Sequence, residues 1–449
     1  MLRDVSILGT ARIVPAGLAL VQSIVLARVL GPEAFGAVAL IAAYPSLVFG
    51  ILNVRTVETT TRFLSDYDTR GLPGRALGLS KVSYIIDLAA AGAAAATVAL
   101  TARWVAPTSA DGMSLAPLMI LFGVSFVPNA LVPTSSGIFV VTGNFLLAGT
   151  LEVAGAALRT VLVIGFVLAG LGVPGVVAGI VAASAAYGLA TVLVAHRVAR
   201  RQWRGSWLLS RWSDLSGERR EIVRFFAFSD LTALCTAAIK NADVLLLGYF
   251  RPTVEVGYYN LGKSLTGQLL VVTSAVRAVA FPQIMRLWTT GAWNRLWAHV
   301  RAHTWQLAVP GTAGILLLML VMEPAILLVY GAEFVPAAPV ARLLLGQVIL
   351  LLLTLWIDMV FLAWGDVHVL LIARATGALV TIVGIVVLVD RLGIAAAALS
   401  LLLQQTLSAA ITVFWMYAHR SARAAEAARR MRVSSAERAQ AGTPGLSSP

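Results

Sequence analysis

The chain has 449 residues, of which 59% are hydrophobic and 12% are Asp, Glu, Lys or Arg. A soluble domain has about 25% charged residues, and a mean hydropathy of +0.86 leaves too little polar surface to cover several water-facing globules. The composition therefore excludes a soluble multidomain protein and predicts an all-α membrane protein.

Apolar stretches long enough to cross a membrane recur along the whole chain. A helix needs about 20 apolar residues to cross roughly 30 Å of hydrocarbon. The fourth stretch is interrupted by Pro117, Pro128 and Pro133, and we expect a kinked span there because neighbouring membrane helices can satisfy the carbonyls that proline frees. The sequence predicts twelve spans, at 8–29, 35–54, 80–101, 115–139, 147–169, 174–195, 225–248, 255–280, 304–329, 338–362, 368–389 and 393–417.

Lysine and arginine gather in alternate connections between these spans. The connections after spans two, six and eight and the tail after span twelve are basic, whereas those after spans one, three, five, seven, nine and eleven hold one Lys or Arg each or none. Basic loops stay in the cytoplasm, so both termini are predicted to be cytoplasmic. Topology thus accounts for the net charge of +13, and no nucleic-acid partner is expected.

Four regions follow from this pattern. An N-terminal six-helix bundle is expected over 1–195, a basic cytoplasmic linker over 196–224 and a C-terminal six-helix bundle over 225–419. The tail over 420–449 is basic and then rich in Gly, Pro and Ser, and it has no apolar face to bury. Such a segment is expected to be disordered, with a membrane-surface helix over 424–432 as the alternative.

An internal repeat relates the two bundles. The junction LARVLGPEAFGAVAL at 26–40 and the junction LLGYFRPTVEVGYYNL at 246–261 both place a Pro, an acidic residue and a Gly between two apolar helices. Aligning them maps Gly36 to Gly257, an offset of 221 residues.

A second pair of junctions gives the same offset. GLGVPGVVAG at 170–179 is similar to DRLGIAAAAL at 390–399, and Gly172 maps to Gly393. Six spans separate the copies, so both halves enter the membrane from the same side. Parallel repeats about an axis along the membrane normal are typical of secondary transporters, whose substrate site lies between the halves, and a central cavity is therefore expected.

Several junctions resemble those of a known family. ARVLGPEAFGAVAL at 27–40 resembles the first–second helix junction of the bacterial polysaccharide (O-antigen-type) flippases, within the multidrug/oligosaccharidyl-lipid/polysaccharide exporter superfamily. Further resemblances are DVLLLGYFRPTVEVGYYNLGKSL at 243–265, VYGAEFVPAAPVARLL at 329–344 and LGIAAAALSLLL at 392–403. The lipid II flippase branch has paired arginines in its first helix, where Gly17 to Val25 here is apolar apart from Gln22 and Ser23.

The resemblance implies a function, a location and partners. Members of the family move an undecaprenyl-diphosphate-linked glycan from the inner to the outer leaflet of the bacterial cytoplasmic membrane. Alternating access around a central cavity is the implied mechanism. The implied partners are the lipid-linked glycan and the lipid bilayer, with glycan polymerase or assembly proteins as further candidates. The missing arginine pair argues against peptidoglycan precursor as the cargo.

Charged residues inside the expected spans are the candidates for a substrate site. A charge at the bilayer centre costs about 2.5–3.5 kcal/mol on insertion scales, so it needs a partner or a water-filled cavity. Cations facing the cavity would suit an anionic diphosphate, which Arg can also bind bidentately. The cations expected to do so are Arg12, Lys240 and Lys263, and the acidic candidates are Asp230, Asp243 and Asp358.

A structural role is the competing interpretation of these charges. Lys240 and Asp243 are spaced i,i+3 and could simply neutralise each other. Glu152 and Arg159 share a helix face two turns apart and could hold helices together.

Two other functions compete with the flippase. A cation-coupled multidrug exporter of the same superfamily would need a proton- or sodium-binding carboxylate deep in one half, and the three acidic candidates could serve. A glycan polymerase or ligase would need a large external loop, but the longest outside connection runs only from Arg103 to Ser114. With one cysteine, five histidines and no P-loop or nucleophile elbow, we expect no enzyme, cofactor or metal site.

Overall fold

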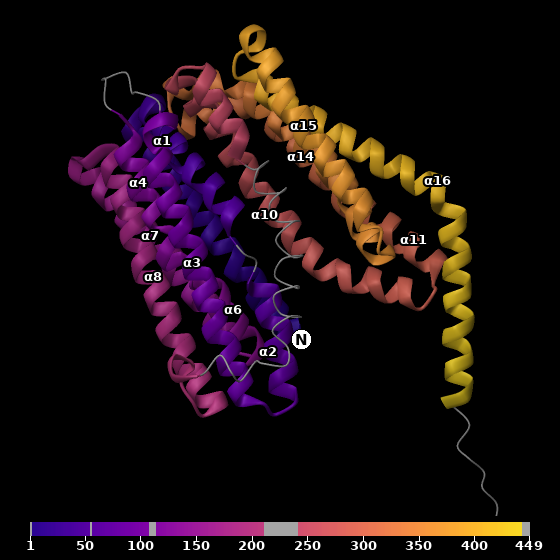
Figure 1. Cartoon of the computed structure of the whole chain (residues 1–449). Coiled ribbons are helices and arrows are strands. Elements are labelled where there is room, and N and C mark those ends of the chain that lie inside the picture. The colour runs from indigo at the N-terminus through magenta and orange to yellow at the C-terminus, as the bar shows by residue number, and fades with distance from the viewer. Residues whose placement is uncertain (1, 54–55, 107–113, 211–240, 442–449) are drawn as a thin grey trace, which may run out of the picture.

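The computed structural model describes residues 2–53, 56–106, 114–210 and 241–441, and helices dominate all of them (Figure 1). This confirms the predicted all-α class. The first half contains α1 (Leu2–Leu52), α2 (Thr56–Thr69), α3 (Pro73–Val105), α4 (Ala116–Val124), α5 (Phe126–Asn129), α6 (Val132–Val141), α7 (Phe145–Phe166) and α8 (Gly172–Trp203). After a helix over 241–250, the second half contains α10 (Thr253–Thr289), α11 (Trp293–His303), α12 (Val309–Leu320), α13 (Met322–Val329), α14 (Ala338–Trp364), α15 (Val367–Leu392) and α16 (Ala395–Ala441).

The spans lie close to their predicted positions. The described residues contain eight helical stretches that are long and apolar enough to cross a membrane. Two of these stretches, Ile13–Leu52 and Phe145–Trp203, each hold two predicted spans, because glycines with positive φ divide them: Gly31 (φ +75°) in the first and Gly170 (φ +85°) in the second. The predicted eighth span is α10. Of the seventh, the structure describes only 241–248, which are helical.

The fourth span is kinked, as its prolines predicted. It is divided into α4, α5 and α6, and proline occupies the first turn of both α4 and α6. Proline is tolerated there because the first amides of a helix have no intrahelical acceptor. The breaks therefore fall where the missing amide hydrogen is least costly.

The predicted repeat is visible in the backbone. Gly172 and Gly393 have nearly the same conformation, with φ/ψ of 53°/−139° and 56°/−136°. Gly36 and Gly257 face each other across the two halves. A Cβ on Gly36 would lie 2.0 Å from the carbonyl oxygen of Thr253, and a Cβ on Gly257 would lie 2.0 Å from that of Pro32. Pro32 and Thr253 are themselves 221 residues apart, so the contact is reciprocal, as a two-fold relation requires.

Apolar packing divides the molecule into one shared core and two separate ones. The shared core combines side chains of both halves, among them Leu40, Ile41, Leu247, Tyr259 and Leu345. A second core lies only in the first half, around Tyr67 and Phe139, and a third only in the second half, around Trp288 and Trp356. Figure 1 shows the consequence: the halves meet along α1 and α10 and diverge toward the end that carries α2 and α11.

We call the contact of α1 with α10 the seam. Ser264 of α10 and Ser23 of α1 place their hydroxyl oxygens 3.4 Å apart across it.

A second contact joins α1 to α13. Arg28 of α1 donates from Nε to the carbonyl of Val329, 2.7 Å away, and also to that of Leu328. These carbonyls belong to the last turn of α13, where a cation is favoured by the helix dipole.

The predicted disorder of the tail is wrong for the described part of it. α16 continues without a break to Ala441, so 420–441 are helical. Ala, Arg, Glu and Met are good helix formers, and extending an existing helix avoids the cost of nucleation. The composition indicates correctly that the segment has no apolar face to bury. A helix that continues span twelve can form without such a face.

Candidate functional site

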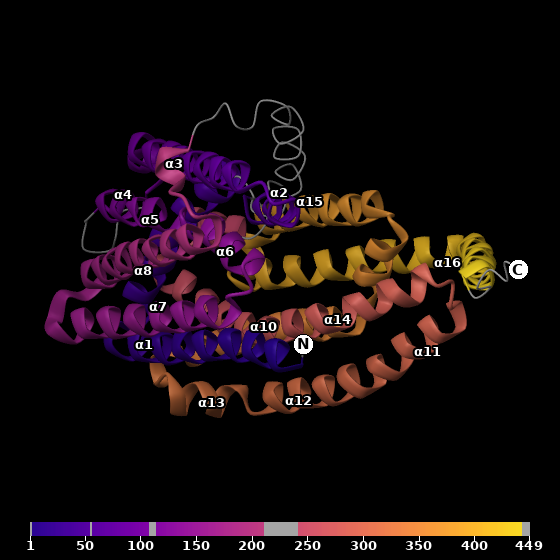
Figure 2. The same ribbon diagram turned by 90° about the horizontal axis from the view of Figure 1, so that it is seen from below.

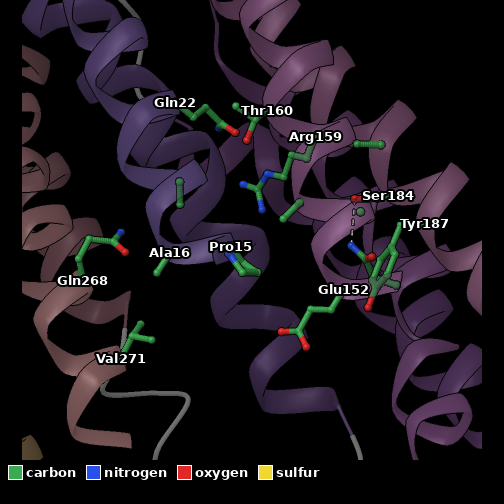
Figure 3. Close-up of a pocket in the computed structure, with 15 residues that line it drawn as sticks. Pro15, Ala16, Gln22, Glu152, Arg159, Thr160, Ser184, Tyr187, Gln268 and Val271 are labelled. Atoms are coloured by element: carbon green, nitrogen blue, oxygen red, sulfur yellow. Dashed lines mark hydrogen bonds between the residues drawn. The ribbon is translucent and has the colours of Figure 1, made fainter. Parts of the chain in front are cut away.

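A cavity of about 690 Å³ lies between the halves (Figure 3). Its α1 and α10 residues, among them Gln22 and Gln268, follow Ser23 and Ser264 toward the end at which the halves diverge in Figure 1. The cavity is therefore closed by the seam at one end. Its walls come from α1, α5, α7, α8 and α10, and they carry Pro15, Ala16, Ala19, Gln22, Asn129, Glu152, Gly155, Ala156, Arg159, Thr160, Ala183, Ser184, Tyr187, Gln268 and Val271.

Arg159 is the cation of this cavity. It projects from α7 toward α1 in Figure 3, and its residue is exposed although it lies in the middle of a membrane-spanning helix. Among the described residues, its guanidinium has no carboxylate within ion-pair distance, Glu152 included. A guanidinium left in this state inside a membrane needs water or an anionic ligand. The cavity is where either could reach it.

Polar groups on four helices complete the lining. Gln22 of α1 and Gln268 of α10 face the cavity from the two halves. Asn129 donates to Ser184 at 3.0 Å, which ties α5 to α8. The ring of Tyr187 packs directly on Gly155 of α7, so closely that a Cβ at this position would lie 2.5 Å from it. Amides, hydroxyls and a phenol offer the hydrogen bonds that a sugar or phosphate requires.

The second half contains a smaller polar cavity of about 290 Å³. Asp358 of α14 accepts a hydrogen bond from Arg277 of α10 and lies 3.6 Å from Arg374 of α15. Three α16 residues of its lining, Gln404, Gln405 and Ser408, lie 221 positions after Ala183, Ser184 and Tyr187 of the first cavity. The two cavities are thus related by the repeat, and two arginines share a single carboxylate in the second.

The buried Asp243 forms an ion pair with the half-buried Lys263. The Lys263 ammonium lies 2.7 and 2.8 Å from the two Asp243 carboxylate oxygens, and Tyr259 donates to the same carboxylate. The backbone amide of Val244 donates as well, at 2.9 Å. The Asp243 side chain is 2% exposed. The pair joins the helix over 241–250 to α10, and Lys263 does not line either cavity.

We expect Lys263→Met to destabilise the protein, because it leaves a buried carboxylate without its cation. Breaking a buried ion pair costs about 3–5 kcal/mol. Thermal unfolding of the purified protein should show a lowered Tm, and Lys263→Met/Asp243→Asn should recover most of the loss. A double variant that regains its Tm but not its transport would instead assign Lys263 to the substrate.

The predicted site residues divide into three groups. Lys263, Asp243 and Asp358 are described, and all three are engaged in ion pairs. Arg12 belongs to α1, but the description does not extend to its side chain. Asp230 and Lys240 lie outside the described residues. Whether these six residues bind substrate stays a prediction.

Sequence reasoning did not select Arg159. Its spacing from Glu152 suggested a structural pair, whereas both side chains line the cavity. One signal could have found it: the seven-residue separation is too long for the i,i+3 or i,i+4 contact of paired helix residues.

Comparisons with known proteins agree with this architecture. A sequence model of the family described as "Polysaccharide biosynthesis protein" matches residues 1–288. No curated protein matches the sequence.

Solved structures of low sequence identity share the fold. An inward-facing multidrug resistance transporter of the MATE family, in the MOP superfamily, has a TM-score of 0.69 and 16% identity, covering 92% of this chain and 98% of the other. The lipid II flippase MurJ, in an inward closed conformation, has a TM-score of 0.69 and 12% identity, covering 93% and 88%. A MOP superfamily transporter from Pyrococcus furiosus has a TM-score of 0.62 and 14% identity, covering 94% and 96%.

Proposed function

Because the chain belongs to the polysaccharide biosynthesis protein family, we propose that it is a flippase for a lipid-linked oligosaccharide or polysaccharide repeat unit. The cargo would be carried on undecaprenyl diphosphate and moved from the inner to the outer leaflet of the cytoplasmic membrane. A glycan headgroup crosses hydrocarbon only if the protein supplies polar partners along the way. The lipid tail needs no such path.

The observation that carries the proposal is Arg159, which lies in a polar cavity between the halves and pairs with no carboxylate of the described residues. A diphosphate is an anion with several acceptor oxygens, and a guanidinium offers planar paired donors to it. The uncharged Gln22, Gln268 and Ser184 suit sugar hydroxyls. Apart from Arg159 and the carboxylate of Glu152, the polar lining is uncharged, which fits a cargo with one anionic group and a larger neutral part.

The arrangement of the halves supports alternating access. Basic residues in alternate connections favour a cytoplasmic location for both termini. On that topology, the seam closes the outer side and the cavity faces the cytoplasm. The structure then represents the loading state, in which a headgroup enters from the inner leaflet.

A cation-coupled multidrug exporter is the second candidate. This candidate is favoured by the fold, which the chain shares with a multidrug resistance transporter of the MATE family. Such an exporter would need a carboxylate available to a proton or sodium ion. Of the three acidic candidates, Asp230 lies outside the described residues. Asp243 and Asp358 are each matched by Lys or Arg, and these two pairings support the flippase.

Reconstitution separates the two candidates. Vesicles containing the purified protein and a fluorescently tagged undecaprenyl-diphosphate oligosaccharide would receive a membrane-impermeant quencher. The flippase should expose inner-leaflet lipid, so that quenching exceeds the outer-leaflet fraction seen in protein-free vesicles. Quenching equal to that baseline, together with ion-driven efflux of a cationic dye, would contradict the proposal and establish the exporter.

A further inference from the structure

A second large hollow lies away from the seam, between the end of α10, the start of α11 and the extension of α16. Its volume is about 1110 Å³, which exceeds the usual range for small-molecule pockets. Figure 1 shows α11 beside the bend of α16. We call this hollow the basal groove; its lining includes Arg286, Trp293, Arg295, Ala424, Ala428 and Met431.

The charge of the basal groove has one sign. Arg286 and Arg295 both line it and both are exposed. The lining includes no Asp or Glu, and within the described chain neither arginine forms an ion pair with a carboxylate. The groove therefore presents two guanidinium groups that are free to bind an anion.

The opposite wall is apolar. α16 contributes Ala424, Ala428 and Met431, which follow one another along one face of the helix. A small hydrophilic anion would gain no binding free energy from contact with this apolar wall. An amphiphile would use both sides, with its phosphate on the arginines and its first methylenes on α16.

Packing holds both walls in place. Trp293 stacks on Trp364 with ring centroids 6.2 Å apart and an interplanar angle of 15°, and it also contacts Trp288 and Trp297. Four indoles thus fix the turn between α10 and α11. Arg423 anchors α16 nearby by donating to Asp366 of the α14–α15 turn. It also donates to Glu426 of the same helix at 2.6 Å.

We propose that the basal groove binds the headgroup of an anionic phospholipid of the cytoplasmic leaflet. Tryptophan clusters mark the membrane–water interface, and basic pockets between helices on the cytoplasmic side suit anionic lipid headgroups. The occupied groove would tie α11 and the α16 extension to the membrane surface. This inference uses the proposed topology but not the identity of the transported cargo.

Lipid-dependent thermal stability tests the proposal. The full-length protein would be placed in nanodiscs of phosphatidylcholine with or without phosphatidylglycerol, and its unfolding temperature measured. Phosphatidylglycerol should raise the Tm of the natural protein. Arg286→Gln/Arg295→Gln should abolish most of this rise. Arg301→Gln is the matched control, because Arg301 is an exposed arginine of α11 that does not line the groove.

Two further measurements make the outcome decisive. Native mass spectrometry should find phosphatidylglycerol retained by the natural protein and by Arg301→Gln, but not by the double variant, even if the double variant has a lower Tm without lipid. Equal retention by all three proteins would overturn the proposal. So would an equal rise in Tm caused by inorganic phosphate, because the site would then recognise a free anion and not a lipid.

Discussion

Arg159→Gln is expected to abolish most transport while the protein inserts and accumulates normally. Each charge-assisted hydrogen bond to a phosphate contributes about 1.5–3 kcal/mol, which corresponds to roughly 10- to 100-fold in affinity. Glutamine keeps some hydrogen-bonding capacity but loses the charge and the paired donors. The readout is quenching of the tagged lipid in vesicles, normalised to the amount of reconstituted protein.

Three companion variants exclude a structural explanation. Arg159→Lys keeps the charge without the planar donors and should retain partial transport. If Arg159 only balanced Glu152, Glu152→Gln/Arg159→Gln should restore transport, and we expect it to stay inactive. Arg301→Gln, outside the cavity, should transport normally. Normal transport by Arg159→Gln would remove the diphosphate role of this arginine without affecting the family assignment.

Sequence patterns predicted the scaffold because its determinants are local. Hydrophobic runs locate spans wherever the membrane is the solvent, and prolines located the breaks between α4, α5 and α6. Gly36 and Gly257 were aligned from their junctions alone. The structure adds the physical reason: each allows the opposing backbone to approach to a distance that a Cβ would block.

The site depends on features that a linear pattern does not contain. Asp243 pairs with Lys263, twenty residues along the chain, because helix 241–250 packs on α10. The i,i+3 rule instead favoured Lys240 as its partner. Arg159 faces a cavity because of how α7 is rotated relative to α1 and α10, and the sequence of one helix does not specify that rotation. Only tertiary packing distinguishes these roles.

The same packing predicts that locking the seam should stop transport. Alternating access requires the outer closure between α1 and α10 to open. Ser23 and Ser264 lie across it with hydroxyl oxygens 3.4 Å apart, and a disulfide needs sulfurs at about 2.05 Å. In a Cys235→Ser background, Ser23→Cys/Ser264→Cys should therefore cross-link under mild oxidation with little movement. Transport should fall to the protein-free baseline and return after reduction.

A disulfide that does not cross the seam is the matched control for this experiment. Thr60 and Ser83 both belong to the first half, with hydroxyl oxygens 3.0 Å apart. Thr60→Cys/Ser83→Cys should cross-link without loss of transport, because both residues lie in the same half and need not separate when the seam opens. Ser23→Cys alone and Ser264→Cys alone should keep full transport under the same oxidising conditions, because neither can form the disulfide. Full transport by quantitatively cross-linked Ser23→Cys/Ser264→Cys would mean that cargo passes without opening of the seam, and alternating access about α1 and α10 would be wrong.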